Sequence, residues 1–205
     1  MTPASSTAPT AAPLVSIGAG LPYRGFTADE YHAMGAAGIL HPDERTELID
    51  GQIVPMSLVS GPHVFTVQRL SRFLEKALDA LPAPRPFVST QSPVRLASRV
   101  EPEPDIAVLR PEADVPRVPT AADALLVVEV SVSTRAYDRD VKLPLYARAG
   151  IPEVWIVVPE ERIVEVYRRP GGAAYAEMQT LGPDGALTLA ALPQMAPIPA
   201  APLFD

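Results

Sequence analysis

The sequence has 205 residues, of which 47% are hydrophobic and 20% charged, with no cysteine and a formal net charge of −7. This composition is typical of one globular domain with appended segments, and it excludes a disulfide scaffold, a thiolate zinc site and a thiol nucleophile. The acidic balance argues against a protein that coats nucleic acid through a broad basic surface, so any contact with DNA would be local. The apolar runs are shorter than the roughly 18 residues of a membrane span, so we expect no membrane partner. The absence of cysteine fits a cytoplasmic setting, which is our expectation.

The predicted elements begin after a tail. Residues 1–22 carry no charged side chain and are dominated by Ala, Pro, Ser and Thr, which predicts a flexible segment. The predicted domain covers residues 23–170 and opens with a short helix behind Thr27-Ala28-Asp29-Glu30, a capping box. A hairpin is expected around Asp50-Gly51, because this pair tolerates the positive φ angles of a tight turn. A long amphipathic helix is predicted over residues 62–81, where apolar residues recur at helical spacing: Val64, Val67, Leu70, Leu74, Ala77, Leu78 and Leu81.

The rest of the chain predicts strands around one further helix. The expected strands are residues 87–96 (interrupted at Pro93), 105–109, 124–131, 154–158 and 163–168. The expected helix is 135–149, ended by Gly150. Residues 171–205 are rich in Pro, Ala and Gly, which predicts a C-terminal hairpin and a loose end packed on the same domain. This order of elements predicts an α/β (α+β) fold.

Two acidic residues stand beside predicted strands. Asp105 follows Pro104 at the start of an apolar run, where it is either a site residue or a solvated turn acid. Glu129 interrupts the apolar run 125–130, and an ionised carboxylate buried there without a partner would cost several kcal/mol. Glu129 therefore needs a cation beside it. A metal ion and a structural arginine are both compatible with the sequence.

The lysines are rare enough to need an explanation. The chain has fifteen arginines but only two lysines, Lys76 and Lys142. Lys142 follows Asp138 by four residues on a predicted helix, so the pair is either a surface ion pair or part of a site in which a compact ammonium orients water and stabilises a phosphate. Glu47 opens the hairpin, and His63 opens the long helix. Each is either a site residue or a local structural contact.

In the order and spacing of these residues the sequence resembles the Uma-type restriction endonucleases, a bacterial family of the PD-(D/E)XK nuclease superfamily. The resemblance runs from about Phe26 to Arg168. It is carried by Glu47-Leu48-Ile49-Asp50-Gly51, Pro104-Asp105, Val128-Glu129-Val130-Ser131, Ser133-Thr134, Asp138, Lys142, Tyr146 and residues 150–157. It implies a restriction-endonuclease-like core, with a mixed central sheet flanked by helices and elaborated by an N-terminal helix and hairpin.

The resemblance assigns the metal site. Asp105 becomes the aspartate of the PD element and Glu129 the second acid, while Val130 offers its main-chain carbonyl. The position normally held by lysine is Ser131, and the family implies that Lys142 on the following helix reaches into that place. Such a hard oxygen shell suits Mg2+, or Mn2+, better than Zn2+.

The resemblance also bears on residues beside the metal ligands and Lys142. Glu47 and His63 match the family's hairpin glutamate and the histidine that opens its next helix, so both are expected to complete the site. Val158 departs from the pattern, because relatives tend to carry aspartate there. Arg135 and Arg139 stand near Lys142 on the predicted helix. They either hold flanking phosphates of the substrate or are solvated helix charges.

The implied function is a metal-dependent DNA endonuclease that hydrolyses phosphodiester bonds, with Lys142 positioning or deprotonating the attacking water. A homodimer is expected if both strands of a duplex are cut. The alternative is a catalytically degenerate binding or regulatory protein with a nuclease fold, which the net acidity and the missing strand lysine favour. A third interpretation is purely structural and gives Glu129 an arginine partner.

Overall fold

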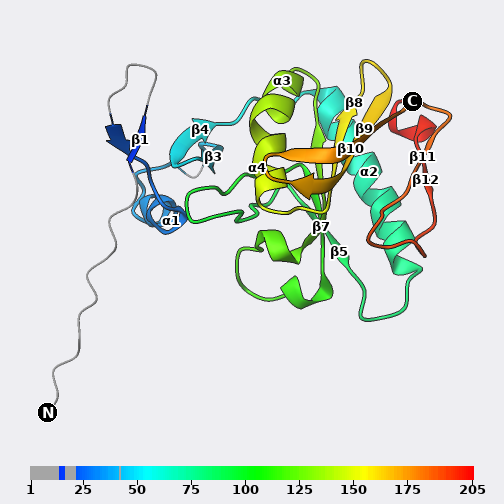
Figure 1. The fold of residues 1–205 in the computed structure, drawn as a ribbon, viewed down its shortest axis with the longest axis horizontal. Coiled ribbons are helices and arrows are strands. Elements are labelled where there is room, and N and C mark those ends of the chain that lie inside the picture. Colours follow the sequence, from blue (N-terminus) through cyan, green and yellow to red (C-terminus); the bar gives the residue numbers. More distant parts are fainter. Residues whose placement is uncertain (1–13, 17–21, 42) are drawn as a thin grey trace, which may run out of the picture.

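The computed structural model describes residues 14–16, 22–41 and 43–205. Its centre is a six-stranded sheet with the order β10-β9-β8-β7-β6-β5 (Figure 1). Strands β7 and β8 are parallel, and the other neighbours are antiparallel, so the sheet is mixed as expected. The strands are β5 (Phe87–Thr90), β6 (Ile106–Leu109), β7 (Ala124–Val130), β8 (Glu153–Val158), β9 (Ile163–Gly171) and β10 (Ala174–Leu181).

A helical crossover joins the two parallel strands. It consists of α3 (Arg135–Tyr137), the π-helical turn η3 (Asp138–Lys142) and α4 (Leu143–Arg148). The predicted regular helix over residues 135–149 is therefore wrong in its middle. The amide of Leu143 donates to the carbonyl of Asp138, one residue further back than in an α-helix. Gly150 ends the crossover with a φ of 77°, as its sequence position indicates.

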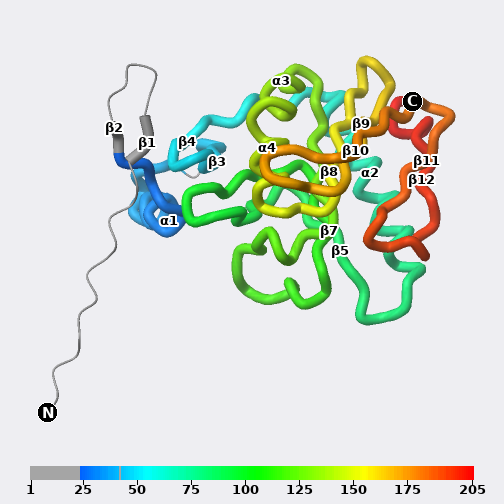
Figure 2. Tube along the Cα trace, viewed as in Figure 1, coloured from blue at the N-terminus to red at the C-terminus, as the bar shows by residue number. Residues whose placement is uncertain are grey.

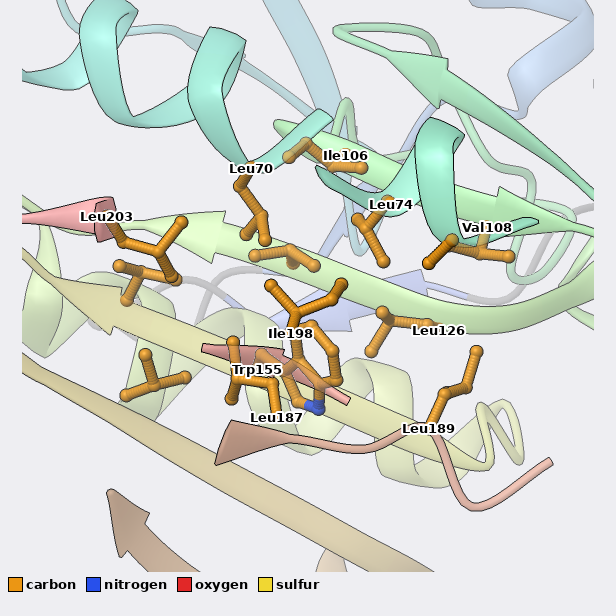
Figure 3. Packing of buried hydrophobic residues seen from close by; sticks show 14 of the residues in the cluster. Leu70, Leu74, Ile106, Val108, Leu126, Trp155, Leu187, Leu189, Ile198 and Leu203 are labelled. Carbon is orange, nitrogen blue, oxygen red and sulfur yellow. The ribbon is translucent and has the colours of Figure 1, made fainter. Parts of the chain in front are cut away.

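The helix α2 (Gly61–Asp79) covers one face of the sheet. The Ser60 side chain caps its first turn by accepting from the amide of His63. Five residues of the predicted apolar stripe are buried: Val67, Leu70, Leu74, Ala77 and Leu78. Val64 is 37% exposed, and Leu81 lies beyond the end of the helix and is half-buried. Leu70 and Leu74 pack against strands β6 and β7 (Figure 3).

The C-terminal segment packs on the same face as α2. Strands β11 (Ala186–Leu187) and β12 (Ile198–Pro199) pair with each other, and Figure 2 shows this segment running beside α2. Leu187 and Ile198 join Trp155 of β8 in one apolar cluster (Figure 3). A second cluster lies on the opposite face, where Tyr146 of α4 covers residues of β7 and β8. Three short 3-10 turns complete the described helices: Pro111–Ala113, Ala121–Asp123 and Ala201–Leu203.

The N-terminal elements are β1 (Leu14–Ser16), β2 (Pro22–Arg24), α1 (Ala28–Ala36), β3 (Thr46–Ile49) and β4 (Gln52–Pro55). Thr27 and Glu30 form the predicted capping box. Strands β3 and β4 form the predicted hairpin, in which Asp50 and Gly51 have φ angles of 48° and 79°. Much of the predicted tail, residues 1–13 and 17–21, lies outside the described residues, but β1 pairs with β2 where a flexible segment was expected. None of the described helices has both the length and the apolarity to cross a membrane.

Candidate active site

A cleft of about 490 Å³ opens where the hairpin, the start of α2, the ends of β6 and β7, and the π-helical turn meet. The predicted residues Glu47, His63, Asp105, Glu129 and Lys142 all line it. These five side chains come from distant parts of the sequence, and the sheet and its crossover bring them to one place. The structure thus assembles the predicted group in a single cleft.

Glu129 is held from two sides by residues of the crossover. It is 3% exposed, and it lies on the sheet face that α4 covers because its side chain alternates with that of Val128. The Tyr146 hydroxyl donates to Glu129 Oε1 over 2.5 Å. Lys142 Nζ lies 3.3 Å from the same oxygen. The partner cation is therefore a lysine, and the structural interpretation through an arginine is wrong.

Lys142 bridges two carboxylates. It is 5% exposed, so the interpretation as a surface ion pair is wrong. Its Nζ also lies 3.1 Å from Glu47 Oε2, and the Tyr137 hydroxyl donates to Glu47 Oε1 over 3.0 Å. Lys142 belongs to the π-helical turn η3 and lines the cleft, and its ion-pair partners there are Glu47 and Glu129 instead of Asp138.

Asp138, at the start of the same turn, also lines the cleft. Its Oδ2 accepts from the hydroxyls of Ser131, over 2.6 Å, and Thr134, over 2.7 Å. Ser131 occupies the position that carries lysine in the superfamily pattern. Its buried hydroxyl ties the end of β7 to the crossover, which helps to hold Lys142 in place.

Burial and charge shift the acid–base properties of this group. Burial raises the pKa of the Glu129 carboxyl well above its ordinary value, and the negative charges of Asp138 and Asp105 add to the effect against the opposing charge of Lys142. Burial alone would lower the pKa of the Lys142 ammonium. The negative charges of Glu129, Glu47 and Asp138 outweigh burial and raise that pKa above its ordinary value. Lys142 is therefore held as an ammonium, which donates hydrogen bonds and stabilises negative charge but does not abstract a proton.

Asp105 is positioned by a main-chain amide and by His63. Its Oδ2 accepts from the amide of Val130 over 2.7 Å, and His63 Nε2 lies 2.9 Å from its Oδ1. In an extended strand the amide and the carbonyl of one residue point to the same side, so the Val130 carbonyl also faces the edge at which Asp105 stands. Asp105 and the buried Glu129 are thus both neighbours of Val130, and all three line the cleft.

The donors fit a hard cation in chemical type. Within residues 14–16, 22–41 and 43–205, no group of three or more His, Asp or Glu side chains is arranged as a metal site. The expected ligands are instead two carboxylates, of Asp105 and Glu129, and one main-chain carbonyl. Mutual repulsion contributes to the raised pKa of Glu129, and a divalent cation between the two carboxylates would relieve it.

The two arginines expected to hold substrate phosphates do not line the cleft. Arg135 binds Glu161 and lies 2.6 Å from Glu165, while Arg139 lies 3.6 Å from Glu165. Both arginines therefore contribute to an ion-pair cluster around the buried Glu165. This is neither of the expected roles in full, because the arginines do not line the cleft and are not solvated charges without a protein partner. Val158, the second departure from the family pattern, packs in the apolar cluster under α4.

The sequence did not single out two tyrosines and a loop. Tyr146 was noted only as part of the resemblance, although it follows Lys142 by four residues, a spacing that places both on one helical face. Nothing in the sequence pattern indicated that Tyr137 contacts Glu47, because this contact depends on the tertiary structure. Residues 56–60, which form one rim of the cleft, also carried no motif.

Comparisons with known proteins identify the family and the fold. The model of the Uma2 family, described as "Putative restriction endonuclease", matches residues 28–201. The chain belongs to the Uma2 family. The resemblance seen in the sequence is therefore confirmed, and it extends beyond the expected end at Arg168. A search of the curated proteins found no match.

A solved structure shares the fold. It is the crystal structure of a putative nuclease belonging to DUF820 from Anabaena variabilis, with a TM-score of 0.67 and 17% sequence identity. The match covers 87% of this chain and 97% of that one. The expected α/β architecture is thus confirmed over most of the Uma2 chain described here.

Proposed function

We propose that this Uma2 protein is a metal-dependent endonuclease that hydrolyses phosphodiester bonds in DNA. The observation that carries the proposal is the convergence of Asp105, Glu129 and Lys142 in one cleft. Asp105, Glu129 and the Val130 carbonyl would hold Mg2+ or Mn2+. When bound, such an ion lowers the pKa of a coordinated water and polarises the scissile phosphate.

The other residues of the site position the reacting groups and stabilise the negative charge that develops on the phosphate. The Lys142 ammonium donates hydrogen bonds to the attacking water and to the phosphate oxygens, on which negative charge develops. Its raised pKa supports this role over that of a general base. Glu47 fixes the ammonium, and Tyr137 fixes Glu47. His63 orients the Asp105 carboxylate through its Nε2.

A second candidate function is a nuclease-fold protein that binds without turnover. Both Asp105 oxygens have protein partners, the Val130 amide and the His63 ring. Each of these contacts uses one of the two lone pairs of its oxygen, which reduces the directions from which a cation could bind Asp105. In this alternative, calorimetry with MgCl2 or MnCl2 would detect no binding to the wild-type protein.

Plasmid cleavage tests the first proposal. Purified protein should convert supercoiled plasmid to nicked and linear forms in Mg2+ or Mn2+, and EDTA should stop the reaction. The Glu129→Ala variant should be inactive. Equal cutting by the wild type and Glu129→Ala would refute the assigned site, because a contaminating nuclease would then explain the activity.

A further inference from the structure

The two carboxylate oxygens of Glu129 have different surroundings. Oε1 accepts a hydrogen bond from the Tyr146 hydroxyl over 2.5 Å and lies 3.3 Å from Lys142 Nζ. A carboxylate oxygen has two lone pairs, so these two donors use both of them. In the part of the chain that the structure describes, Oε2 has no hydrogen-bond or ion-pair partner, although Glu129 is buried and lines the cleft. Oε2 is therefore the oxygen of Glu129 that can take a cation.

Neither oxygen of Asp105 is open to the same degree. Oδ2 accepts from the amide of Val130 over 2.7 Å, and Oδ1 lies 2.9 Å from His63 Nε2. Each oxygen of Asp105 thus keeps one lone pair. Of the side-chain oxygens assigned to the metal, only Glu129 Oε2 keeps both lone pairs within residues 14–16, 22–41 and 43–205. A cation in the cleft would therefore find its least obstructed side-chain ligand at Glu129 Oε2.

Tyr146 is the group that can hold Glu129 in this orientation. Its side chain is 0% exposed and packs in the apolar cluster between α4 and the sheet, so the hydroxyl cannot follow a carboxylate that rotates. The last torsion of a glutamate side chain is otherwise only broadly restricted. Lys142 restrains the carboxylate less, because its ammonium is on a flexible stem and is shared with Glu47 at 3.1 Å.

We propose that Tyr146 is a positioning residue for the cation, which fixes the Glu129 carboxylate so that Oε2 faces the cleft. This inference rests on the proposed function, since it concerns the cation of that proposal, and it adds a residue that does not line the cleft. Groups that orient the ligands of a metal contribute to its affinity without touching it. Their loss typically weakens metal binding by about 10- to 100-fold.

A second tyrosine–glutamate pair provides a matched comparison. The Tyr167 hydroxyl donates to Glu165 Oε2 over 2.8 Å, both residues are buried, and Tyr167 packs in the same apolar cluster as Tyr146. Neither member of this pair lines the cleft. Tyr167→Phe should therefore remove the same kind of hydrogen bond and lower stability to a similar extent, but it should not change the affinity for a cation.

Isothermal titration calorimetry with MnCl2, on the full chain without DNA, tests the inference. Tyr146→Phe keeps the buried ring and removes only the hydroxyl. It should raise the Kd for Mn2+ at least about tenfold, whereas Tyr167→Phe should bind as the wild type does. Similar Tm values of the two variants would show that the change in affinity is not a loss of fold. In cleavage assays, higher MnCl2 should restore the kcat of Tyr146→Phe, because the missing hydroxyl touches no substrate.

The outcomes separate this inference from the proposed function. Weak Mn2+ binding by Tyr146→Phe supports the inference even if the wild type binds Mn2+ and cuts no DNA, a result that would refute only the proposed function. Equal Mn2+ affinity of the wild type and Tyr146→Phe would overturn the inference and leave the nuclease proposal intact. An equal loss in Tyr146→Phe and Tyr167→Phe would also overturn it, because the whole layer and not one hydroxyl would then determine the affinity. A wild type that binds no Mn2+ would overturn the inference together with the assigned metal site.

Discussion

Lys142 and Glu129 form a buried ion pair across two elements, with Nζ 3.3 Å from Oε1. The carboxylate lies on the central strand β7, and the ammonium comes from the π-helical turn of the crossover. Glu47 of the hairpin is the second partner of the ammonium, at 3.1 Å. One cation thus compensates two buried acids, and this dependence makes the site open to specific tests.

Removal of the ammonium should abolish cleavage. Lys142→Met should reduce kcat by about 100- to 1000-fold, because the developing phosphate charge loses its donor. It should also lower the free energy of unfolding by about 3 kcal/mol, since Glu47 and Glu129 stay buried without a cation. Lys142→Arg should not restore activity, because the planar guanidinium cannot replace a compact ammonium. Lys76→Met is the control: this exposed lysine at the end of α2 should be dispensable for cleavage.

Metal binding should stabilise the fold. MgCl2 at about 100 times its Kd should add about 2.7 kcal/mol to the free energy of unfolding, seen as a higher Tm by differential scanning fluorimetry. Asp105→Asn should remove the shift because it removes a ligand charge. Asp114→Asn, at an exposed position outside the cleft lining, should keep it. A wild-type Tm that responds to neither Mg2+ nor Mn2+ would contradict the assigned metal site.

The buried Asp138 should make stability depend on pH. Burial raises the pKa of this carboxyl above its ordinary value of 3.8, despite the hydroxyls of Ser131 and Thr134. A raised folded-state pKa gives stability that is complete below the unfolded-state pKa and is lost as the pH rises through the folded-state value. The Asp138→Asn variant has no carboxyl to ionise at this position, so it does not lose stability in this way as the pH rises. In urea unfolding it should therefore gain stability relative to the wild type between pH 3.5 and pH 8, and a constant difference over this range would argue against the shift.

The arginines of the crossover should contribute to the stability of the fold and not to the binding of substrate. Arg135→Ala should destabilise the protein by about 2 kcal/mol, because Glu165 is 2% exposed and loses its closest cation. The KM for DNA should stay unchanged, since Arg135 does not line the cleft. Chemical denaturation and steady-state kinetics measure the two effects. An increase in KM without a change in stability would restore the phosphate-binding role expected from the sequence.

Local signals predicted much of the fold. The capping box at Thr27 and Glu30, and the turn at Asp50-Gly51, are determined by neighbouring residues, and both are present. Glu129 was identified because an acid inside an apolar strand requires compensation wherever the strand lies. The family pattern placed Lys142 in the same site although its position departs from the superfamily spacing.

Tertiary interactions determined what the sequence left open. The π-helical turn is an exception, because it ends at Leu143, directly before Pro144. A proline has no amide N–H and crowds the carbonyl four residues back, so it disturbs a regular helix, and the prediction of one helix over residues 135–149 did not take Pro144 into account. The contact of Tyr137 with Glu47 depends on how the hairpin meets the crossover. Arg135 turns toward Glu165 for the same reason, since its partner lies on β9, far along the chain.

The transfer of the lysine from the strand to the crossover changes what holds the site together. Where lysine and glutamate are two residues apart on one strand, the backbone fixes their separation. Here the separation depends on the packing of Tyr146 and its neighbours between α4 and the sheet. A small loosening of that layer would separate ammonium from carboxylate while the sheet stays intact. Heat inactivation should therefore precede unfolding, and cleavage should be lost several degrees below the Tm.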